Sequence, residues 1–259
     1  MERKFLTILR GTIGSGAHGV AIEGTDDHDE MGVVIESYED AVGIGSPFEH
    51  YIFRTATERT GKNDARSMPG DLDLTLYSLS KYLRLALKGN PSVLIPLFLP
   101  SGLLTVCTIE GSELQKLAPK IISKKAIWAF YHYLRAQKGK LSGEKGTRVH
   151  RPELVEKYGY DTKFAMHALR LGMQGLELAR GHTLSLPMTP VHREFLLEVR
   201  TGHYKLDFIL NYIEHLEEKL LRWTELTALP DEPDTKAVEE WMRDVYWATW
   251  SEERAGMFV

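Results

Sequence analysis

Two aspartate pairs, each with one residue between its members, are the clearest candidates for chemistry in this chain. Asp27 and Asp29 lead into the apolar run 33–35. Asp71 and Asp73 lie in a stretch in which polar and apolar residues alternate. Successive side chains of an extended segment point to opposite sides, so the two members of each pair point to the same side. Three or four carboxylates would therefore meet if the two segments form neighbouring strands.

Carboxylates held so close together repel each other, and either a raised pKa of one carboxyl or a divalent cation bound between them relieves the repulsion. Such clusters hold metal ions for phosphoryl transfer, in two-metal sites whose ions lie about 3.5–4 Å apart. Aspartates supply the oxygen ligands that Mg²⁺ and Mn²⁺ prefer. The spacing therefore predicts a magnesium or manganese site on Asp27, Asp29 and a third carboxylate, either Asp73 or Asp71.

A glycine-serine pair upstream offers groups that bind phosphate. Glycine at position 14 lets the backbone approach a triphosphate closely, and the Ser15 hydroxyl and neighbouring N–H groups can donate to phosphate oxygens. We therefore expect Gly14 and Ser15 to bind a nucleotide beside the metal site.

The region before about residue 105 has short apolar runs punctuated by glycine, a pattern typical of strands. Between the second and third runs, residues 58–70 are polar and contain glycine, which predicts a loop. From Ser78, which can cap a helix, the apolar period becomes helical, and the Gly89-Asn90-Pro91 sequence ends it. The three predicted strands cover residues 5–9, 32–35 and 71–76.

The chain after about residue 112 has a mostly helical pattern. One helix is expected to begin after the capping residue Asp161 and to end at Gly181. These patterns predict an α+β fold, with a sheet-containing domain at residues 1–111 and a helical domain at residues 112–259. The four main helices of the second part are expected at residues 124–141, 161–180, 207–229 and 235–250.

Composition and charge narrow the class of protein. The chain has 259 residues and a formal net charge of −4, which argues against a continuous basic surface for duplex nucleic acid. Cys107 is the only cysteine, so intramolecular disulfides and thiolate zinc clusters are excluded. No apolar run approaches a membrane span, and the first residues do not have the pattern of a signal peptide. We therefore expect a soluble, cytoplasmic protein.

Two groups of cations are candidates for contact with phosphate. Lys163 and Arg170 lie on one face of the expected helix 161–180, where they either neutralise a leaving pyrophosphate or form an ordinary solvated face. A second group surrounds Glu144 in a segment that contains glycine. It predicts a mobile basic loop that either receives a nucleic-acid phosphate backbone or is simply solvated. The cations of this loop are Lys138, Lys140, Lys145, Arg148 and Arg151.

The ordered set of these motifs resembles the DNA-polymerase-β nucleotidyltransferase superfamily. A glycine-serine pair is followed by an Asp-x-Asp segment entering a strand and later by a third aspartate on another strand. Several stretches are similar, more closely, to the predicted bacterial and phage nucleotidyltransferases associated with RNA repair, and they cover most of the chain. The matching stretches are residues 14–19, 27–33, 78–91 and 160–163, together with His167 and Arg170.

This resemblance implies a small mixed-sheet nucleotidyltransferase core followed by a helical domain. It implies transfer of a nucleoside monophosphate from an NTP such as ATP to an acceptor hydroxyl, with an RNA end as the expected acceptor. Asp27, Asp29 and Asp73 are implied as catalytic metal ligands, while Asp71 is matched less closely. One departure is Asp26, which stands where a serine is expected and adds a negative charge beside the metal site.

Two other classes of protein remain open from the sequence. The same residues could sense an NTP without turnover, as a nucleotide-binding module. The glycines at positions 14, 16 and 19, with Glu36 at the end of a strand, also match the dinucleotide fingerprint of an NAD-dependent oxidoreductase. However, residues 17–23 are too few for the crossover helix of a parallel βαβ unit.

Overall fold

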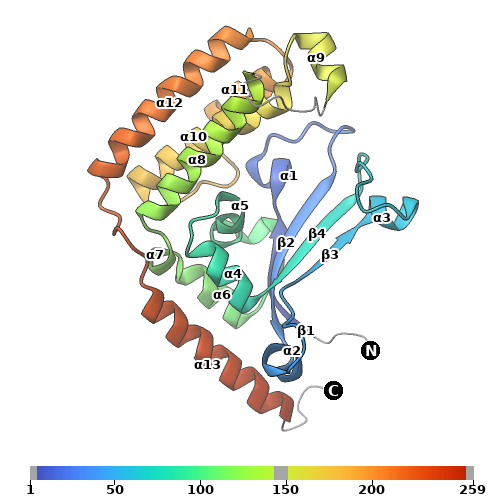
Figure 1. Cartoon of the computed structure of the whole chain (residues 1–259), viewed down its shortest axis with the longest axis vertical. Coiled ribbons are helices and arrows are strands. Elements are labelled where there is room, and N and C mark those ends of the chain that lie inside the picture. Colours follow the sequence, from blue (N-terminus) through green and yellow to red (C-terminus); the bar gives the residue numbers. More distant parts are fainter. Residues whose placement is uncertain (1–4, 143–150, 255–259) are drawn as a thin grey trace. The chain divides into compact units, whose positions relative to one another are not determined.

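The structure, a computed structural model, describes residues 5–142 and 151–254, with side chains as far as residue 251. Tertiary contacts divide the chain into two compact units. Unit 1 comprises residues 1–87, 92–121 and 233–259, and unit 2 comprises residues 88–91 and 122–232. Unit 1 contains a mixed sheet with helices packed on it, and unit 2 is helical (Figure 1), so the predicted fold class is confirmed. Within these residues, every helix falls short of the length or the hydropathy that a bilayer-spanning helix requires.

The sheet of unit 1 is built from five strands. They are β1 (Phe5–Thr12), β2 (His28–Glu36), β3 (His50–Arg54), β4 (Leu72–Ser78) and β5 (Leu104–Cys107). Their order in space is β3-β4-β2-β1-β5; β2 and β4 are parallel, and the other neighbours are antiparallel. Strand β2 lies in the middle of the sheet, and it is therefore buried from Glu30 to Glu36.

Sequence periodicity predicts β1, β2 and β4 correctly but misses β3 and β5. Both missed strands lie at the edges of the sheet, where much of the strand is exposed and apolar alternation is weak. The loop expected at residues 58–70 is wrong in its first part, because helix α3 (Thr55–Thr60) occupies it. Gly61 ends this helix in the left-handed conformation, with a φ of 69°.

The two faces of the parallel strands differ in character. Leu74 and Leu76 of β4 pack against Val34 of β2 in a buried hydrophobic cluster. Asp73 lies on the opposite face of β4, because successive side chains of a strand alternate. This alternation keeps the Asp73 carboxylate out of the apolar core.

Helix α4 (Leu79–Ala86) follows β4 directly and packs against the sheet. The Ser78 hydroxyl accepts a hydrogen bond from the Lys81 N–H at 3.2 Å, which confirms the predicted cap. Helix α6 (Ile109–Lys116) packs against β1, and the two helices lie to one side of the sheet (Figure 1). The buried residues of α4 recur at helical spacing and are Leu79, Tyr82, Leu83 and Ala86.

The C-terminal helix α13 (Thr235–Arg254) belongs to the sheet-containing unit. The Tyr246 hydroxyl donates to Glu36 Oε1 at 2.9 Å, and the Trp250 ring N–H donates to the Glu36 carbonyl oxygen at 2.9 Å. Burial raises the pKa of the Glu36 carboxyl above its ordinary value. The contacts thus group α13 with the sheet, while the expected functional boundary between residues 111 and 112 stays a prediction.

Three long helices form the centre of unit 2. They are α8 (Lys124–Leu141), α10 (Thr162–Gly181) and α12 (Leu206–Leu226), and all three were expected from the sequence within a few residues. A side chain at Gly172 of α10 would collide with Leu216 of α12 and crowd Leu134 of α8. This glycine therefore permits close packing of the three helices.

Both ends of α10 lie where the sequence predicts them. The Asp161 side chain accepts hydrogen bonds from the Lys163 and Phe164 N–H groups, each at 3.0 Å, which confirms the predicted cap. The predicted end at Gly181 is confirmed, and His182, the capping residue that follows, is left-handed, with a φ of 55°. The remaining short helices are α1 (Gly14–His18), α2 (Tyr38–Val42), α5 (Pro91–Leu94), α7 (Ala118–Ile121), α9 (Pro152–Tyr158), α11 (Pro190–Arg200), η1 (Ile95–Phe98) and η2 (Ser101–Leu103).

Candidate active site

Three aspartates from two neighbouring strands lie together at one place on the sheet. Asp27 directly precedes β2, Asp29 lies within β2, and Asp73 lies within β4. Asp29 and Asp73 are partners in the parallel ladder, so their side chains point to the same face. One carboxylate oxygen of each aspartate lies within 4.8 Å of the other two. The expected meeting of carboxylates is therefore present, with Asp73 as its third member.

This aspartate cluster has the donor set of a site for a hard divalent cation. All three ligand atoms are carboxylate oxygens, and all three side chains are half-buried. Oxygen ligands are those that Mg²⁺ and Mn²⁺ prefer, and a cation between the carboxylates would offset their mutual repulsion. The residues present therefore fit either ion by ligand type.

The glycine turn adjoins the aspartate cluster. Helix α1 begins at Gly14, whose φ of 60° lies in the left-handed region. A side chain at Gly14 would clash with the Asp29 carboxylate, and the Ile13 N–H donates to the Asp29 carbonyl oxygen at 2.8 Å. Both backbone conformation and space therefore require glycine at this position. Ser15 is the next residue of α1 and is half-buried.

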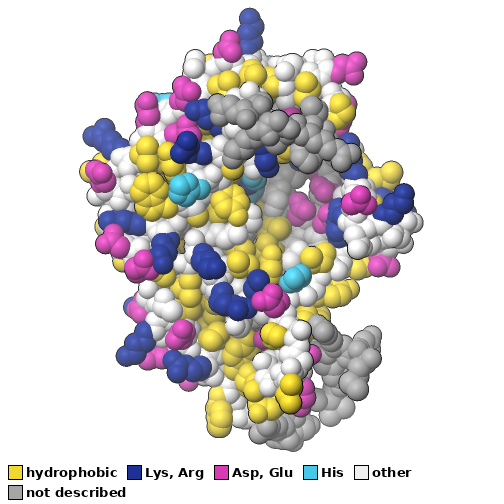
Figure 2. All heavy atoms as spheres, viewed as in Figure 1, with side chains coloured by type: hydrophobic (Ala, Val, Ile, Leu, Met, Phe, Trp, Pro, Cys, Tyr) yellow, Lys and Arg dark blue, Asp and Glu magenta, His cyan; other side chains and the backbone are white. Residues whose placement is uncertain are grey.

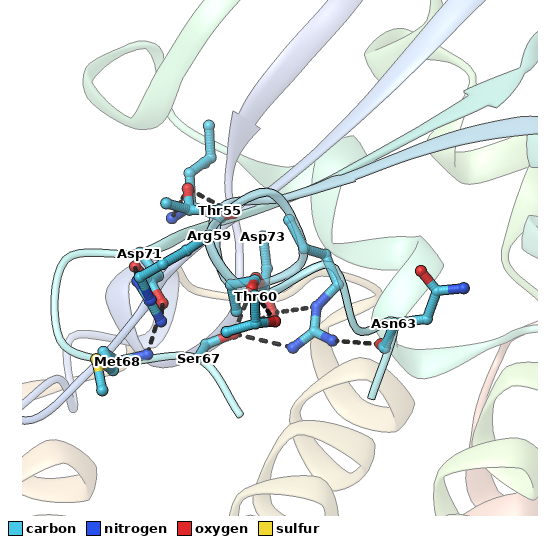
Figure 3. A network of polar contacts seen from close by, with 11 residues as sticks. Thr55, Arg59, Thr60, Asn63, Ser67, Met68, Asp71 and Asp73 are labelled. Carbon is cyan, nitrogen blue, oxygen red and sulfur yellow. Dashed lines mark hydrogen bonds and ion pairs between the residues drawn. The ribbon is translucent and has the colours of Figure 1, made fainter. Parts of the chain in front are cut away.

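Asp71, the alternative third carboxylate, is engaged elsewhere. The Arg59 guanidinium donates to Asp71 Oδ1 at 2.6 Å and to Oδ2 at 2.8 Å, and the Met68 N–H donates to Oδ2 at 2.8 Å (Figure 3). The hydrogen bonds from Arg59 and Met68 hold the pKa of Asp71 below its ordinary value. Asp71 is not part of the group of converging carboxylates, whereas Asp73 is, so the geometry favours Asp73 as the third ligand.

Asp73 has two further partners that the sequence patterns do not indicate. The Arg54 Nε–H donates to Asp73 Oδ2 at 3.1 Å. The Ser67 hydroxyl lies 3.0 Å from Asp73 Oδ1 and 2.9 Å from Oδ2 (Figure 3). Arg54 ends the edge strand β3, which periodicity misses, so no sequence signal places it beside the third aspartate.

Asp26 has a local structural role. Its Oδ2 accepts a hydrogen bond from the Ile22 N–H at 2.8 Å, which closes the turn before Asp27. Asp26 is not part of the group formed by the three converging aspartates. Its carboxylate therefore stabilises the approach to β2 where a serine was expected.

The sheet argues against the dinucleotide-binding alternative. Strands β1 and β2, which flank the glycines at positions 14, 16 and 19, are adjacent and antiparallel. A dinucleotide fingerprint needs two parallel strands joined by a crossover helix. The short helix α1 and the turn after it do not form that unit.

The polar face of α10, which lies in unit 2, is largely buried. Arg170 is 8% exposed, and its guanidinium donates to Gln174 Oε1 at 2.7 Å and to His167 Nδ1 at 2.9 Å. Burial, with Arg170 and other cations nearby, lowers the pKa of His167 to about 3, and burial lowers the pKa of Arg170 to about 10. His167 is therefore neutral at physiological pH. Lys163, one turn earlier, is half-buried.

The first part of the expected basic loop is helical. Lys138 and Lys140 lie in α8, which continues to Leu141, so the loop prediction is wrong for these residues. Lys138 Nζ lies 3.1 Å from Glu214 and 2.8 Å from Glu217 of α12. Its positive charge is therefore paired with carboxylates of α12, within unit 2.

The last cation of the expected loop also has a carboxylate partner. The Arg151 guanidinium lies 3.2 Å from Asp161. Lys145 and Arg148 lie outside the described residues. Figure 2 shows Lys and Arg side chains interspersed with Asp and Glu on the face that it presents. A nucleic-acid role for this segment stays a prediction that now depends on Lys145 and Arg148.

Comparisons with known proteins add a family match. The model of the RlaP family, described as an RNA repair pathway DNA polymerase beta family, matches residues 1–244. Among solved structures, a nucleotidyltransferase-like protein from Exiguobacterium sibiricum 255-15 is similar with 14% sequence identity and a TM-score of 0.31. The alignment covers 83% of this chain and 69% of that protein. A comparison with curated proteins finds no match.

Proposed function

Since the chain belongs to the RNA repair pathway DNA polymerase beta family, we propose that it transfers a nucleoside monophosphate from an NTP to an acceptor hydroxyl. Membership in this family confirms the resemblance identified from the sequence motifs. The expected donor is an NTP such as ATP, used with Mg²⁺ or Mn²⁺. The expected acceptor is an RNA end, and the support for RNA is the family description.

The observation that carries this proposal is the convergence of Asp27, Asp29 and Asp73 within 4.8 Å. Asp27 and Asp29 would hold a divalent cation from β2, and Asp73 would complete its ligand set from β4. A cation bound there supplies electrostatic stabilisation to the charge that develops on a transferring phosphoryl group. Because the aspartates lie on paired strands, their spacing is kept by the hydrogen bonds of the sheet.

Gly14 and Ser15 would hold the triphosphate of the donor. The left-handed glycine brings the chain against Asp29 without a side chain in the way. The Ser15 hydroxyl and the first N–H groups of α1 would donate hydrogen bonds to phosphate oxygens. The nucleotide phosphates would thus be bound next to the carboxylates that would hold the divalent cation.

Lys163 and Arg170 of unit 2 are proposed to contribute positive charge to nucleotide binding. Lys163 is the half-buried member, so it would contact phosphate oxygens directly. Arg170 is buried and bonded to Gln174 and His167, so it would act mainly through its field and by holding the helix face in place. Replacement of Lys163 by Met should accordingly raise KM for the NTP more than it lowers kcat.

Incubation with NTPs labelled on the α-phosphate tests the proposed function. The full chain is mixed with one NTP at a time, Mg²⁺, and RNA, DNA or protein as acceptor. We expect label on the RNA end, release of pyrophosphate, and loss of both on chelation of the metal. The Asp29→Asn variant is the matched control and should transfer no label.

Three other outcomes of that experiment have defined meanings. NTP binding without transfer to any acceptor would identify a nucleotide-sensing module. Label on protein or on a small molecule would overturn the acceptor class while leaving the transferase chemistry intact. Full transfer by the Asp29→Asn variant would remove the aspartate cluster from the mechanism.

A further inference from the structure

The third carboxylate of the aspartate cluster is held by a neighbouring strand as well as by its own. Arg54 is the last residue of β3 and the direct cross-strand partner of Asp73 in the antiparallel β3–β4 ladder. Cross-strand partners have Cβ atoms about 4.5–5.5 Å apart, so the arginine reaches the carboxylate from the same face of the sheet. The Nε–Oδ2 distance is 3.1 Å.

The same guanidinium also binds the loop at residues 61–70. One terminal nitrogen of Arg54 donates to the Ser67 hydroxyl oxygen at 2.9 Å, and the other donates to the Asn63 carbonyl oxygen at 3.0 Å. The Ser67 hydroxyl is in turn within hydrogen-bond distance of both oxygens of Asp73. Asp73, Arg54 and Ser67 therefore form a closed ring of contacts, and Figure 3 labels two of its members, Ser67 and Asp73.

This ring fits the electrostatics of the aspartate cluster. The Arg54 and Asp73 side chains are 26% and 22% exposed, so their attraction is only partly screened by water. A carboxylate offers about four lone-pair positions, so the donors from Arg54 and Ser67 leave room for a further ligand contact. Arg54 thus offsets part of the repulsion among three carboxylates and limits the rotation of Asp73.

A second arginine provides an internal comparison. Arg59 of α3 forms a two-pronged pair with Asp71, and the Met68 N–H connects Asp71 to the same loop. Arg54 therefore contacts residues 61–70 directly, and Arg59 is connected to them through Asp71 and the Met68 N–H. Only Arg54, however, contacts a member of the aspartate cluster.

We propose that Arg54, together with Ser67, is a positioning residue that fixes the Asp73 carboxylate in the orientation needed for the transfer reaction. The inference rests on the proposed function of the aspartate cluster and names residues that the cluster itself does not include. Groups that hydrogen-bond to a ligating carboxylate typically contribute about 10-fold to 100-fold to activity or metal affinity. Arg54 differs from such groups in one respect, because its positive charge opposes that of a bound cation.

The test compares full-length variants in two measurements. Turnover of labelled NTP is measured as kcat and KM, and Mn²⁺ binding is measured directly by electron paramagnetic resonance of the free ion. Arg54→Gln should lower kcat by about 10-fold or more with little change in KM, whereas its dissociation constant for Mn²⁺ should not rise. Arg54→Lys keeps the charge and should recover part of the lost turnover. Ser67→Ala should lower kcat by less.

Arg59→Gln is the matched control, because it removes the ion pair with Asp71, which accepts from the Met68 N–H of the same loop, without touching the cluster. It should keep kcat and Mn²⁺ binding within about twofold of the unchanged protein while lowering Tm. Equal effects of Arg54→Gln and Arg59→Gln would overturn the proposal, since both arginines would then act only by anchoring the loop. Retention of kcat by Arg54→Gln, or a loss of Mn²⁺ binding as large as in Asp73→Asn, would also overturn it.

Failure of this inference can be told apart from failure of the proposed function. If the unchanged protein transfers label and Arg54→Gln keeps its kcat, the inference alone fails. If the unchanged protein transfers no label while Asp73→Asn weakens Mn²⁺ binding, the proposed function fails, the positioning role fails with it, and the metal site stands. If the unchanged protein binds no Mn²⁺, both fail.

Discussion

At the scale of single residues, the candidate site brings three like charges close together. Asp27, Asp29 and Asp73 converge within 4.8 Å, and Arg54 is a cation in contact with one of them. Repulsion of this kind destabilises the folded state unless a cation binds. The cluster is therefore expected to lower stability in return for function, as sites that bind metal or phosphate often do.

Replacement of both Asp27 and Asp29 tests whether these carboxylates lower stability in return for function. The Asp27→Asn, Asp29→Asn variant should fold and lose label transfer, because it removes carboxylate ligands along with their repulsion. Its Tm without metal should equal or exceed that of the unchanged protein, as measured by circular dichroism. Retained transfer would exclude both residues from catalysis, and a large fall in Tm would show that they stabilise the fold.

Substitutions of Asp73 and Asp71 should differ in their effects on turnover and on stability. Asp73→Asn should reduce turnover more than NTP binding, whereas Asp71→Asn should reduce turnover less. Asp71→Asn should instead lower Tm, because Arg59 loses its charged partner. Steady-state kinetics and thermal melts of the two variants check this order, and the reverse order would mean that Asp71 is the third catalytic carboxylate.

At the scale of elements, β2 connects the candidate site to the C-terminal helix. The strand carries Asp29 near its start and ends at Glu36, which Tyr246 and Trp250 of α13 contact. Glu36 Oε2 is buried and has no hydrogen-bond partner among the residues that the structure describes. Burial and the nearby charge of Asp40 raise the pKa of Glu36, while the hydrogen bond from Tyr246 opposes that shift.

The raised pKa of Glu36 predicts a pH dependence of stability. Below about pH 4 the carboxyl is neutral in both folded and unfolded states, and its burial carries no charge penalty. As pH rises through the raised pKa, the folded state must bury a charge and loses stability relative to the unfolded state. The free energy of unfolding of Glu36→Gln should therefore increase relative to that of the unchanged protein as pH rises above the ordinary pKa of glutamate, about 4.3.

Urea denaturation of the two proteins across this pH range measures the difference. Gln at position 36 can still accept the Tyr246 hydrogen bond, so any constant cost of the substitution cancels from the pH dependence. A difference that is flat with pH would show that Glu36 titrates normally in the folded protein. Tyr246→Phe, which removes the donor to Glu36 together with the acceptor of the Ser80 N–H, is the control for the contact between β2 and α13.

At the scale of the whole molecule, the chain divides into two compact units. Gly14 and Ser15 belong to unit 1, and Lys163 and Arg170 belong to unit 2. Each unit has its own buried core, with Leu74 and Leu76 in the sheet and Gly172 at the centre of the helices. Nucleotide binding is thus a property to be tested on the full chain.

Ligand-linked stabilisation provides that test. A ligand that binds only the folded state raises stability by about 1.4 kcal/mol when its concentration is tenfold above Kd. Mg²⁺ with an NTP should therefore raise Tm by a few degrees, and NAD should not. Lys163→Met should reduce the shift, and Asp29→Asn should abolish its dependence on Mg²⁺. A shift with NAD alone would revive the oxidoreductase alternative.

The sequence by itself determined what depends on neighbours along the chain. Alternation along a strand put Asp27 and Asp29 on one side, and capping chemistry placed helix starts at Ser78 and Asp161. Such features arise from interactions within a few residues, so their pattern is visible without a fold. The family resemblance, which matched Asp73 more closely than Asp71, likewise rested on motifs in linear order.

Only the tertiary structure decided which groups from distant segments meet. It separated Asp73 from Asp71, because Arg59 occupies Asp71 while the β2–β4 ladder brings Asp73 beside Asp29. It placed Arg54 on Asp73 through an edge strand that has no clear periodicity. The sequence pattern did not indicate that Arg170 of α10 is buried. Pairing of edge strands and burial of polar groups depend on contacts between residues far apart in sequence. A local sequence pattern therefore does not predict them.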